Sequence, residues 1–98
     1  MSRVDIYQLL HREVVRLLFS WGRRELAREV EREGSSHYIY DYLEKAFAMY
    51  YSEYGGVNCR WLREEIKRDW NRVTSLVLPK LLWQVLQTEP AKSRVVQT

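Results

Sequence analysis

The densest apolar pattern in the chain runs from His37 to Tyr54, HYIYDYLEKAFAMYYSEY, and holds six of the seven tyrosines. On a helical wheel of about 3.6 residues per turn, residues 38–54 spread aromatic and aliphatic side chains over roughly 220°. A surface helix of a small domain typically carries an apolar stripe little wider than about 100°. The pattern therefore predicts a helix over 37–54 that packs against partners on more than one side.

A second broad apolar arc precedes this helix. Apolar residues recur at helical spacing from Ile6 to Phe19, and their arc also covers roughly 220°. Ser2 and Asp5 have the spacing of an N-terminal capping box. We therefore expect a helix that begins near residue 3, and its wide arc also indicates more than one packing partner.

Two glycines bear on where this first helix ends. Gly22 kinks or ends it, or the helix runs unbroken through the good helix formers of 23–33 as far as Gly34. Gly34 has the position of a C-terminal cap, where a glycine readily adopts a positive φ. Ser35 or Ser36 is then predicted to cap the next helix, because serine oxygens accept hydrogen bonds from free helical N–H groups.

A third helix is predicted after the turn at Gly55-Gly56. Its apolar stripe is narrow, roughly 80° on the wheel, and consists of Cys59, Leu62, Ile66, Trp70 and Val73. Pro79 is poorly tolerated inside a helix but not in a first turn, so a short fourth helix is predicted around 81–86. Pro90 ends it, and residues 91–98 form a basic tail or one short strand. The predicted fold is all-α, a single domain of three to four helices over 1–90 followed by the 91–98 tail.

In outline, the segment 57–98 resembles a helix-turn-helix or winged-helix unit. Such a unit would consist of a short strand at Val57, a support helix over 60–69, a recognition helix over 73–86 and a truncated wing strand over 94–97. The resemblance rests on hydrophobic spacing alone, and Pro79 interrupts the recognition helix. A plain antiparallel helix pair gives the same pattern, so both interpretations stay open.

Composition restricts the class of protein. With 98 residues, 46% hydrophobic and 30% charged, the chain fits one folded domain of a size at which oligomerisation often adds buried surface. The single cysteine, Cys59, excludes an internal disulfide and a zinc site with several thiolates. The many charged residues also fit a thermophilic source.

The distribution of charge within the sequence bears on localisation. Charged residues interrupt the first twenty positions, so no secretory signal is predicted. No stretch approaches the roughly 20 apolar residues of a membrane span. We therefore expect a protein of the cytoplasm or of a nucleoprotein assembly. An amphipathic first helix lying on a membrane surface is a weaker alternative, because Asp5 and Glu13 share its polar side with arginines.

Positive charge gathers in the C-terminal part. The formal net charge is only +3, yet residues 57–98 hold eight basic residues against four acids. Arginines beside an exposed aromatic can bind a phosphate backbone and stack on a base. The predicted nucleic-acid-binding residues are Arg60, Trp61, Arg63, Lys67, Arg68, Arg72, Lys80, Lys92 and Arg94. The alternative is a solvated helix face, because Glu64 and Glu65 stand at ion-pair spacing from Arg68.

The tyrosine-rich helix also has two interpretations. Large aromatic side chains are enriched in protein interfaces, and the predicted oligomer or partner interface consists of Tyr7, Trp21, Tyr38, Tyr40, Tyr42, Phe47, Tyr50, Tyr51 and Tyr54. The same residues can instead form the core, with hydroxyl groups reaching its rim. We expect a mixture of core and interface.

No catalytic, metal or cofactor motif is evident. His11 and His37 have no metal-like spacing, and His11 is expected to be a hydrogen-bonded interior or interface residue. Cys59 falls on the apolar stripe of its helix, which favours a buried, unreactive thiol over a reactive one. The acidic pairs on the helices lack a pocket that would make them an acid and a base. The chain is therefore predicted not to be an enzyme, and to need no cofactor or metal.

Two functions remain. The first is a self-associating helical protein that binds nucleic acid mainly electrostatically, as a nucleoprotein or packaging subunit or a small DNA-binding regulator. The second is a helical protein adaptor or scaffold that does not bind nucleic acid. Pairing of the arginines with acids would count against the first function, whereas a contiguous unpaired basic patch would count against the second.

Overall fold

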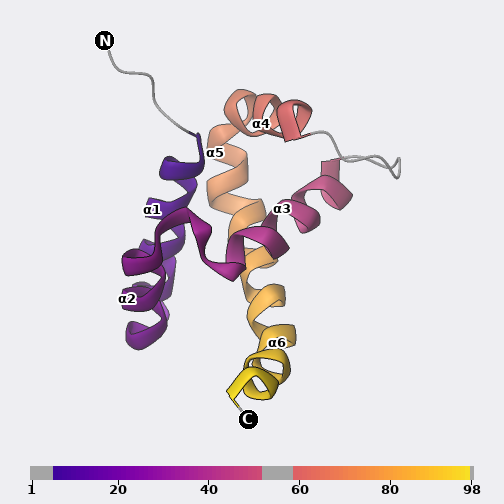
Figure 1. Ribbon diagram of the computed structural model, residues 1–98. Helices are drawn as coiled ribbons and strands as arrows, with labels where there is room; N and C mark the ends of the chain where they lie inside the picture. Colours follow the sequence, from indigo (N-terminus) through magenta and orange to yellow (C-terminus); the bar gives the residue numbers. More distant parts are fainter. Residues whose placement is uncertain (1–5, 52–58, 98) are drawn as a thin grey trace.

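The computed structural model describes residues 6–51 and 59–97, and these form helices with no strand (Figure 1). The all-α fold predicted from the sequence is confirmed. The elements are α1 (Ile6–Ser20), α2 (Arg24–Glu33), the 3₁₀ turn η1 (Gly34–Ser36), α3 (Tyr38–Tyr51), α4 (Cys59–Arg68), α5 (Trp70–Arg72), the π-helical segment η2 (Val73–Val77) and α6 (Leu78–Gln97).

The helices surround one core. Helix α2 folds back beside α1, α3 passes across the middle of the molecule, and α5, η2 and α6 follow one another along a single long course (Figure 1). Helix α1 also contacts α4 and α6, and α3 packs on both α4 and α6. The residues at most 1% exposed come from each of the long helices: Val14, Leu18, Ala27, Val30, Ile39, Phe47, Leu62, Ile66, Val73, Leu78 and Leu82.

The broad apolar arc of α3 is covered from within the chain. Its most buried side chains belong to the core, while Tyr38, Tyr42, Ala46 and Tyr51 are half-buried and pack against that core. The predicted packing on more than one side is therefore confirmed, and α4 and α6 are among the partners. The width of this arc does not by itself require a second subunit.

Gly22 ends α1, which excludes the alternative of one helix unbroken to Gly34. Its φ is +81°, and the chain closes the turn with the Arg23 N–H donating to the Leu18 carbonyl at 2.8 Å. Gly34 ends α2 as predicted, with φ +72°, and its N–H donates to the Val30 carbonyl. Positive φ is the conformation that glycine adopts at little cost, so Gly22 sets the turn between α1 and α2 and Gly34 sets the end of α2.

The cap of α3 differs from the prediction. His37 has extended backbone dihedrals, and its Nδ1 accepts a hydrogen bond from the Ile39 N–H at 3.2 Å. Ser36 instead donates from its hydroxyl to the Glu33 carbonyl at 2.9 Å. The predicted serine cap is therefore wrong. Both serines belong to η1, and His37 is the residue that directly precedes α3.

The C-terminal helix is longer than the prolines predicted. Pro79 is the second residue of α6, directly after η2, so the proline lies within one continuous helical run. Before it, η2 widens the helix, and the Leu78 N–H donates to the Val73 carbonyl five residues back. The predicted end at Pro90 is wrong, since α6 continues to Gln97. Residues 94–97 are accordingly helical rather than a wing strand, and Val57 lies outside the described residues.

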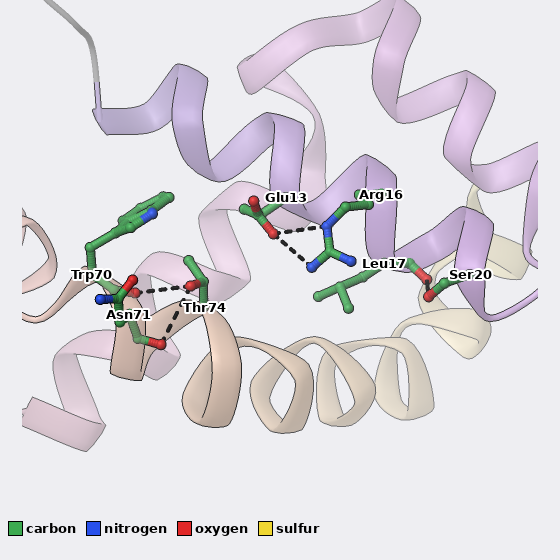
Figure 2. Close-up of polar contacts among 7 residues, drawn as sticks. All are labelled: Glu13, Arg16, Leu17, Ser20, Trp70, Asn71 and Thr74. Carbon is green, nitrogen blue, oxygen red and sulfur yellow. Dashed lines mark hydrogen bonds and ion pairs between the residues drawn. The ribbon is translucent and has the colours of Figure 1, made fainter.

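Local polar contacts occur on α1 and at the start of the π segment (Figure 2). Thr74 donates from its hydroxyl to the Trp70 carbonyl at 3.0 Å, and Arg16 pairs with Glu13 at 2.8 Å (Figure 2). Each polar contact drawn there stays within its own helix. Back-bonding of a threonine to the carbonyl four residues earlier bends a helix, which fits its place at the start of the π segment.

Candidate functional site

Two arginines of the predicted nucleic-acid face are paired with acids. Arg68 forms an ion pair with Glu65, and Arg72 with Asp69 at 3.2 Å, each at a spacing of three residues. Both pairs are exposed, and such pairs stabilise a helix only weakly. Each of these two arginines therefore has a carboxylate beside its positive charge.

Arg63 is held by an aromatic ring. Its guanidinium lies 5.0 Å from the ring centroid of Tyr7, and the Tyr7 hydroxyl donates to Glu44 Oε2 at 3.0 Å. Burial, the largest influence, raises the pKa of Tyr7, which keeps the hydroxyl a donor. Three helices, α1, α3 and α4, meet in this contact, so Arg63 has a structural partner.

Arg72 and Trp61 also contact tyrosines of α3. The Arg72 guanidinium donates to the Tyr50 hydroxyl at 3.0 Å and lies 5.6 Å from the same ring. Trp61 is half-buried and meets Tyr51 edge to face, with the ring centroids 6.4 Å apart. The aromatic predicted to stack on a base is thus partly covered by the core.

The other predicted cations divide into two groups. Lys67 and Lys80 are exposed, and neither forms an ion pair with another residue that the structure describes. The side chains of Arg60, Lys92 and Arg94 lie outside the described residues. The structure therefore does not gather the predicted set into one contiguous unpaired patch within the part that it describes.

The predicted interface residues fall mostly inside the molecule. Tyr40 and Phe47 are core residues, whereas Tyr7, Trp21, Tyr38, Tyr42 and Tyr51 are half-buried against the core. Tyr50 is exposed, next to the exposed Met49, and Tyr54 lies outside the described residues. Among the predicted interface residues that the structure describes, Tyr50 is thus exposed, whereas Tyr40 and Phe47 are buried in the core.

A second surface with exposed apolar side chains lies along α5, η2 and α6, on the side opposite the buried stripe of α6. We call it the outward face and define it by the exposed residues Arg72, Leu76, Lys80, Trp83, Gln84 and Gln87. Leu76 is 60% exposed and Trp83 is 52% exposed. From residue 71 to residue 88 the sequence contains no Asp or Glu.

The sequence contained a signal for this face that the prediction missed. Leu76 and Trp83 are seven residues apart, two helical turns, which places them on one line of a helix. That line is opposite the stripe of Leu78, Leu82 and Val85, all buried. The prediction began the fourth helix only after Pro79, so Leu76 and Trp83 were not placed on the same helix.

A cavity of about 550 Å³ opens between α1, α2 and η1, lined by Gln8, His11, Arg12, Val15, Glu31, Gly34 and Ser35. His11 Nδ1 lies 3.1 Å from the Tyr40 hydroxyl, as expected of a hydrogen-bonded interior histidine. Burial raises the pKa of Tyr40 well above its usual value, so this hydroxyl stays protonated. Among the described residues, no three His, Cys, Asp or Glu side chains are arranged to hold a metal.

Two further searches gave negative results. Within the described ranges, no helix is both long and apolar enough to cross a membrane. Comparison of the chain with models of protein families, with curated proteins and with solved structures found no match.

Proposed function

We propose that this protein is a non-enzymatic helical adaptor that acts through protein–protein contact, with the outward face as its docking surface. The observation that carries the proposal is the exposure of Leu76 and Trp83 on one line of a well-packed helix. Large exposed apolar side chains grouped on a folded domain mark interaction sites.

The composition of the outward face supports this function. The centres of protein interfaces are depleted of charged residues and enriched in aromatics and arginine. The outward face holds a tryptophan and a leucine, with Lys80 between them and neutral glutamines at its edge; Arg72 at one end is bound to Asp69 and Tyr50. Tryptophan and arginine are also the residues that most often dominate binding energy.

Nucleic-acid binding by a self-associating protein is the second candidate. It is favoured by the exposed Lys67 and Lys80 and by the acid-free sequence from 71 to 88. It ranks second because Arg68 and Arg72 are paired with acids and Arg63 lies on Tyr7. Self-association in the cytoplasm is compatible with both functions, with exposed Met49 and Tyr50 as a further apolar contact.

The test offers the protein both kinds of ligand. One is a mixed-sequence nucleic acid, as duplex DNA, single-stranded DNA and RNA; the other is a neutral helical peptide with leucines at seven-residue spacing and glutamines on its flanks. Incorporated 5-fluorotryptophan gives one ¹⁹F signal for each of the four tryptophans. We expect the peptide to shift the Trp83 signal while those of Trp61 and Trp70 stay in place.

The matched variants decide between the candidates. Leu76→Ser should abolish peptide binding, and Gln8→Ser on the exposed side of α1 should leave it unchanged. Light scattering at low and high salt follows self-association and the uptake of nucleic acid. Uptake that falls steeply with salt, and that is lost in Lys67→Glu/Lys80→Glu, would replace the adaptor with the second candidate.

A further inference from the structure

The outward face carries charge of one sign. Lys80 lies between Leu76 and Trp83 in the sequence, is exposed, and has no ion-pair partner among the described residues. Arg72, at one end of the face, is partly neutralised by Asp69 at 3.2 Å. Residues 71–88 include no acid, and no ion pair to Lys80 forms among the described residues, so the charge of Lys80 is open to an acid from another molecule.

The spacing of the apolar anchors fits a helix. Leu76 and Trp83 are seven residues apart, which corresponds to about 10.5 Å along an α-helix at about 1.5 Å per residue. A second helix lying along α6 repeats its own apolar side chains at the same interval, at positions i and i+7. One apolar stripe of such a partner therefore meets both anchors.

Trp83 is already positioned for contact. Its ring meets the ring of Trp21 edge to face, with centroids 5.6 Å apart and an interplanar angle of 86°. Trp21 is half-buried and packs against the core. An aromatic side chain held in place before binding loses less conformational entropy on binding, so this contact favours Trp83 as the main anchor.

We infer that the outward face binds an acidic amphipathic helix of a partner protein, whose apolar stripe contacts Leu76 and Trp83 and whose flanking Asp or Glu residues pair with Lys80. This inference rests on the proposed adaptor function and adds the chemical class of the partner. A second copy of the chain fits less well, because two outward faces bring Lys80 residues together without any acid between them, and like charges oppose association.

The experiment compares three synthetic peptides that share leucines at seven-residue spacing and differ only in flanking residues, which are Glu, Gln or Lys. Calorimetry gives the affinities, and the ¹⁹F signal of 5-fluorotryptophan at position 83 reports the place of binding. We expect the Glu peptide to bind most tightly and the Lys peptide least tightly. High salt should weaken binding of the Glu peptide and leave the affinity for the Gln peptide nearly unchanged.

Charge reversal supplies the matched control. Lys80→Glu should lower the affinity for the Glu peptide by about fivefold, the effect of one exposed ion pair. It should raise the affinity for the Lys peptide. Arg12→Glu, an equal change at an exposed position of α1, should alter neither affinity. Because Lys80 is exposed, circular dichroism of the variant should match the unmodified protein.

The possible failures are distinguishable. Equal affinity for the three peptides, unaffected by Lys80→Glu, would overturn the acidic partner and leave the adaptor function standing. Binding of none of them, with the Trp83 signal unmoved, would overturn the adaptor function as well. Self-association that is lost in Leu76→Ser would assign the outward face to a second copy and overturn the acidic partner.

Discussion

At the residue scale, His37 combines a structural role with an unusual environment. It is 4% exposed, its Nδ1 accepts from the Ile39 N–H, and its Nε2 has no hydrogen-bond partner among the described residues. Burial lowers the pKa of His37 and outweighs the opposing effect of Glu29 and Glu33, while His11 lowers it further. The ring therefore favours its neutral form in the folded protein.

This environment predicts a dependence of stability on pH. The pKa of His37 is lower in the folded chain than in the unfolded chain, where it is about 6.5. The neutral ring therefore makes its full contribution to the free energy of unfolding above about pH 6.5. This contribution is lost as the pH falls through about 6.5 toward the lowered folded value. His37→Asn retains a capping oxygen but does not titrate. Urea unfolding should therefore show a larger loss between about pH 7.5 and pH 5 in the unmodified protein; equal losses would contradict the prediction.

Tyr40 gives a second prediction at this scale. Tyr40→Phe removes the hydroxyl that contacts His11 Nδ1 in a largely buried place, 3.1 Å away. We expect the free energy of unfolding to fall by about 1 kcal/mol, the usual net value of a hydrogen bond. Tyr50→Phe is the control, because the Tyr50–Arg72 hydrogen bond is exposed. Chemical denaturation of both variants should give the larger loss at Tyr40.

At the scale of elements, Gly34 sets the end of α2. Its φ is +72° and its ψ is −159°, a region that is occupied almost only by glycine. A Cβ at this position would have no heavy atom within 4 Å, so Gly34→Ala changes only the backbone energy. We expect a loss of about 1–3 kcal/mol in thermal unfolding. Ser35→Ala, at an exposed neighbouring position, should cost much less.

The π segment makes a sharper prediction about Val73. Val73 and Leu78 are five residues apart and both are fully buried, although residues at this spacing point about 140° apart in a regular α-helix. Val73→Ala should therefore cost about 1–3 kcal/mol, as expected for a truncated core side chain. Leu76→Ala, exposed on the same segment, should cost far less. A negligible cost at Val73 would show that the wider turn does not form in solution.

Sequence patterns foretold the elements better than their junctions. The glycines marked the ends of α1 and α2, and hydrophobic spacing marked α1, α3 and α4, because local preferences decide such features. The third helix predicted to run through Val73 was wrong in its length, since α4 ends at Arg68 and Asp69 separates it from α5. The π segment was not predictable, since Pro79 argues against the helix that contains it. The histidine cap was missed because histidine is not among the preferred capping residues. The partner of Arg63 was also missed, since Tyr7 lies in another helix far away in sequence.

At the scale of the whole molecule, Tyr7, Arg63 and Glu44 link three helices. Because the Arg63 guanidinium lies on the Tyr7 ring, the two residues should be energetically coupled. A double-mutant cycle of Tyr7→Leu and Arg63→Gln, measured by urea unfolding, should give a coupling energy of about 0.5–1 kcal/mol. Strict additivity of the two changes would show that the contact contributes nothing.

The π segment has a consequence for how such a chain can vary. A π turn holds one more residue than the α turn it replaces, and such turns are usually single local widenings. Deleting one residue from 73–77 would leave a uniform helix whose upstream part is rotated by about 100° relative to α6. Helix α4 and its arginines would then point in a new direction relative to α6 and Trp83. Deleting a single codon would thus turn the arginine-bearing surface of α4 relative to α6 without changing any residue of α4 or α6.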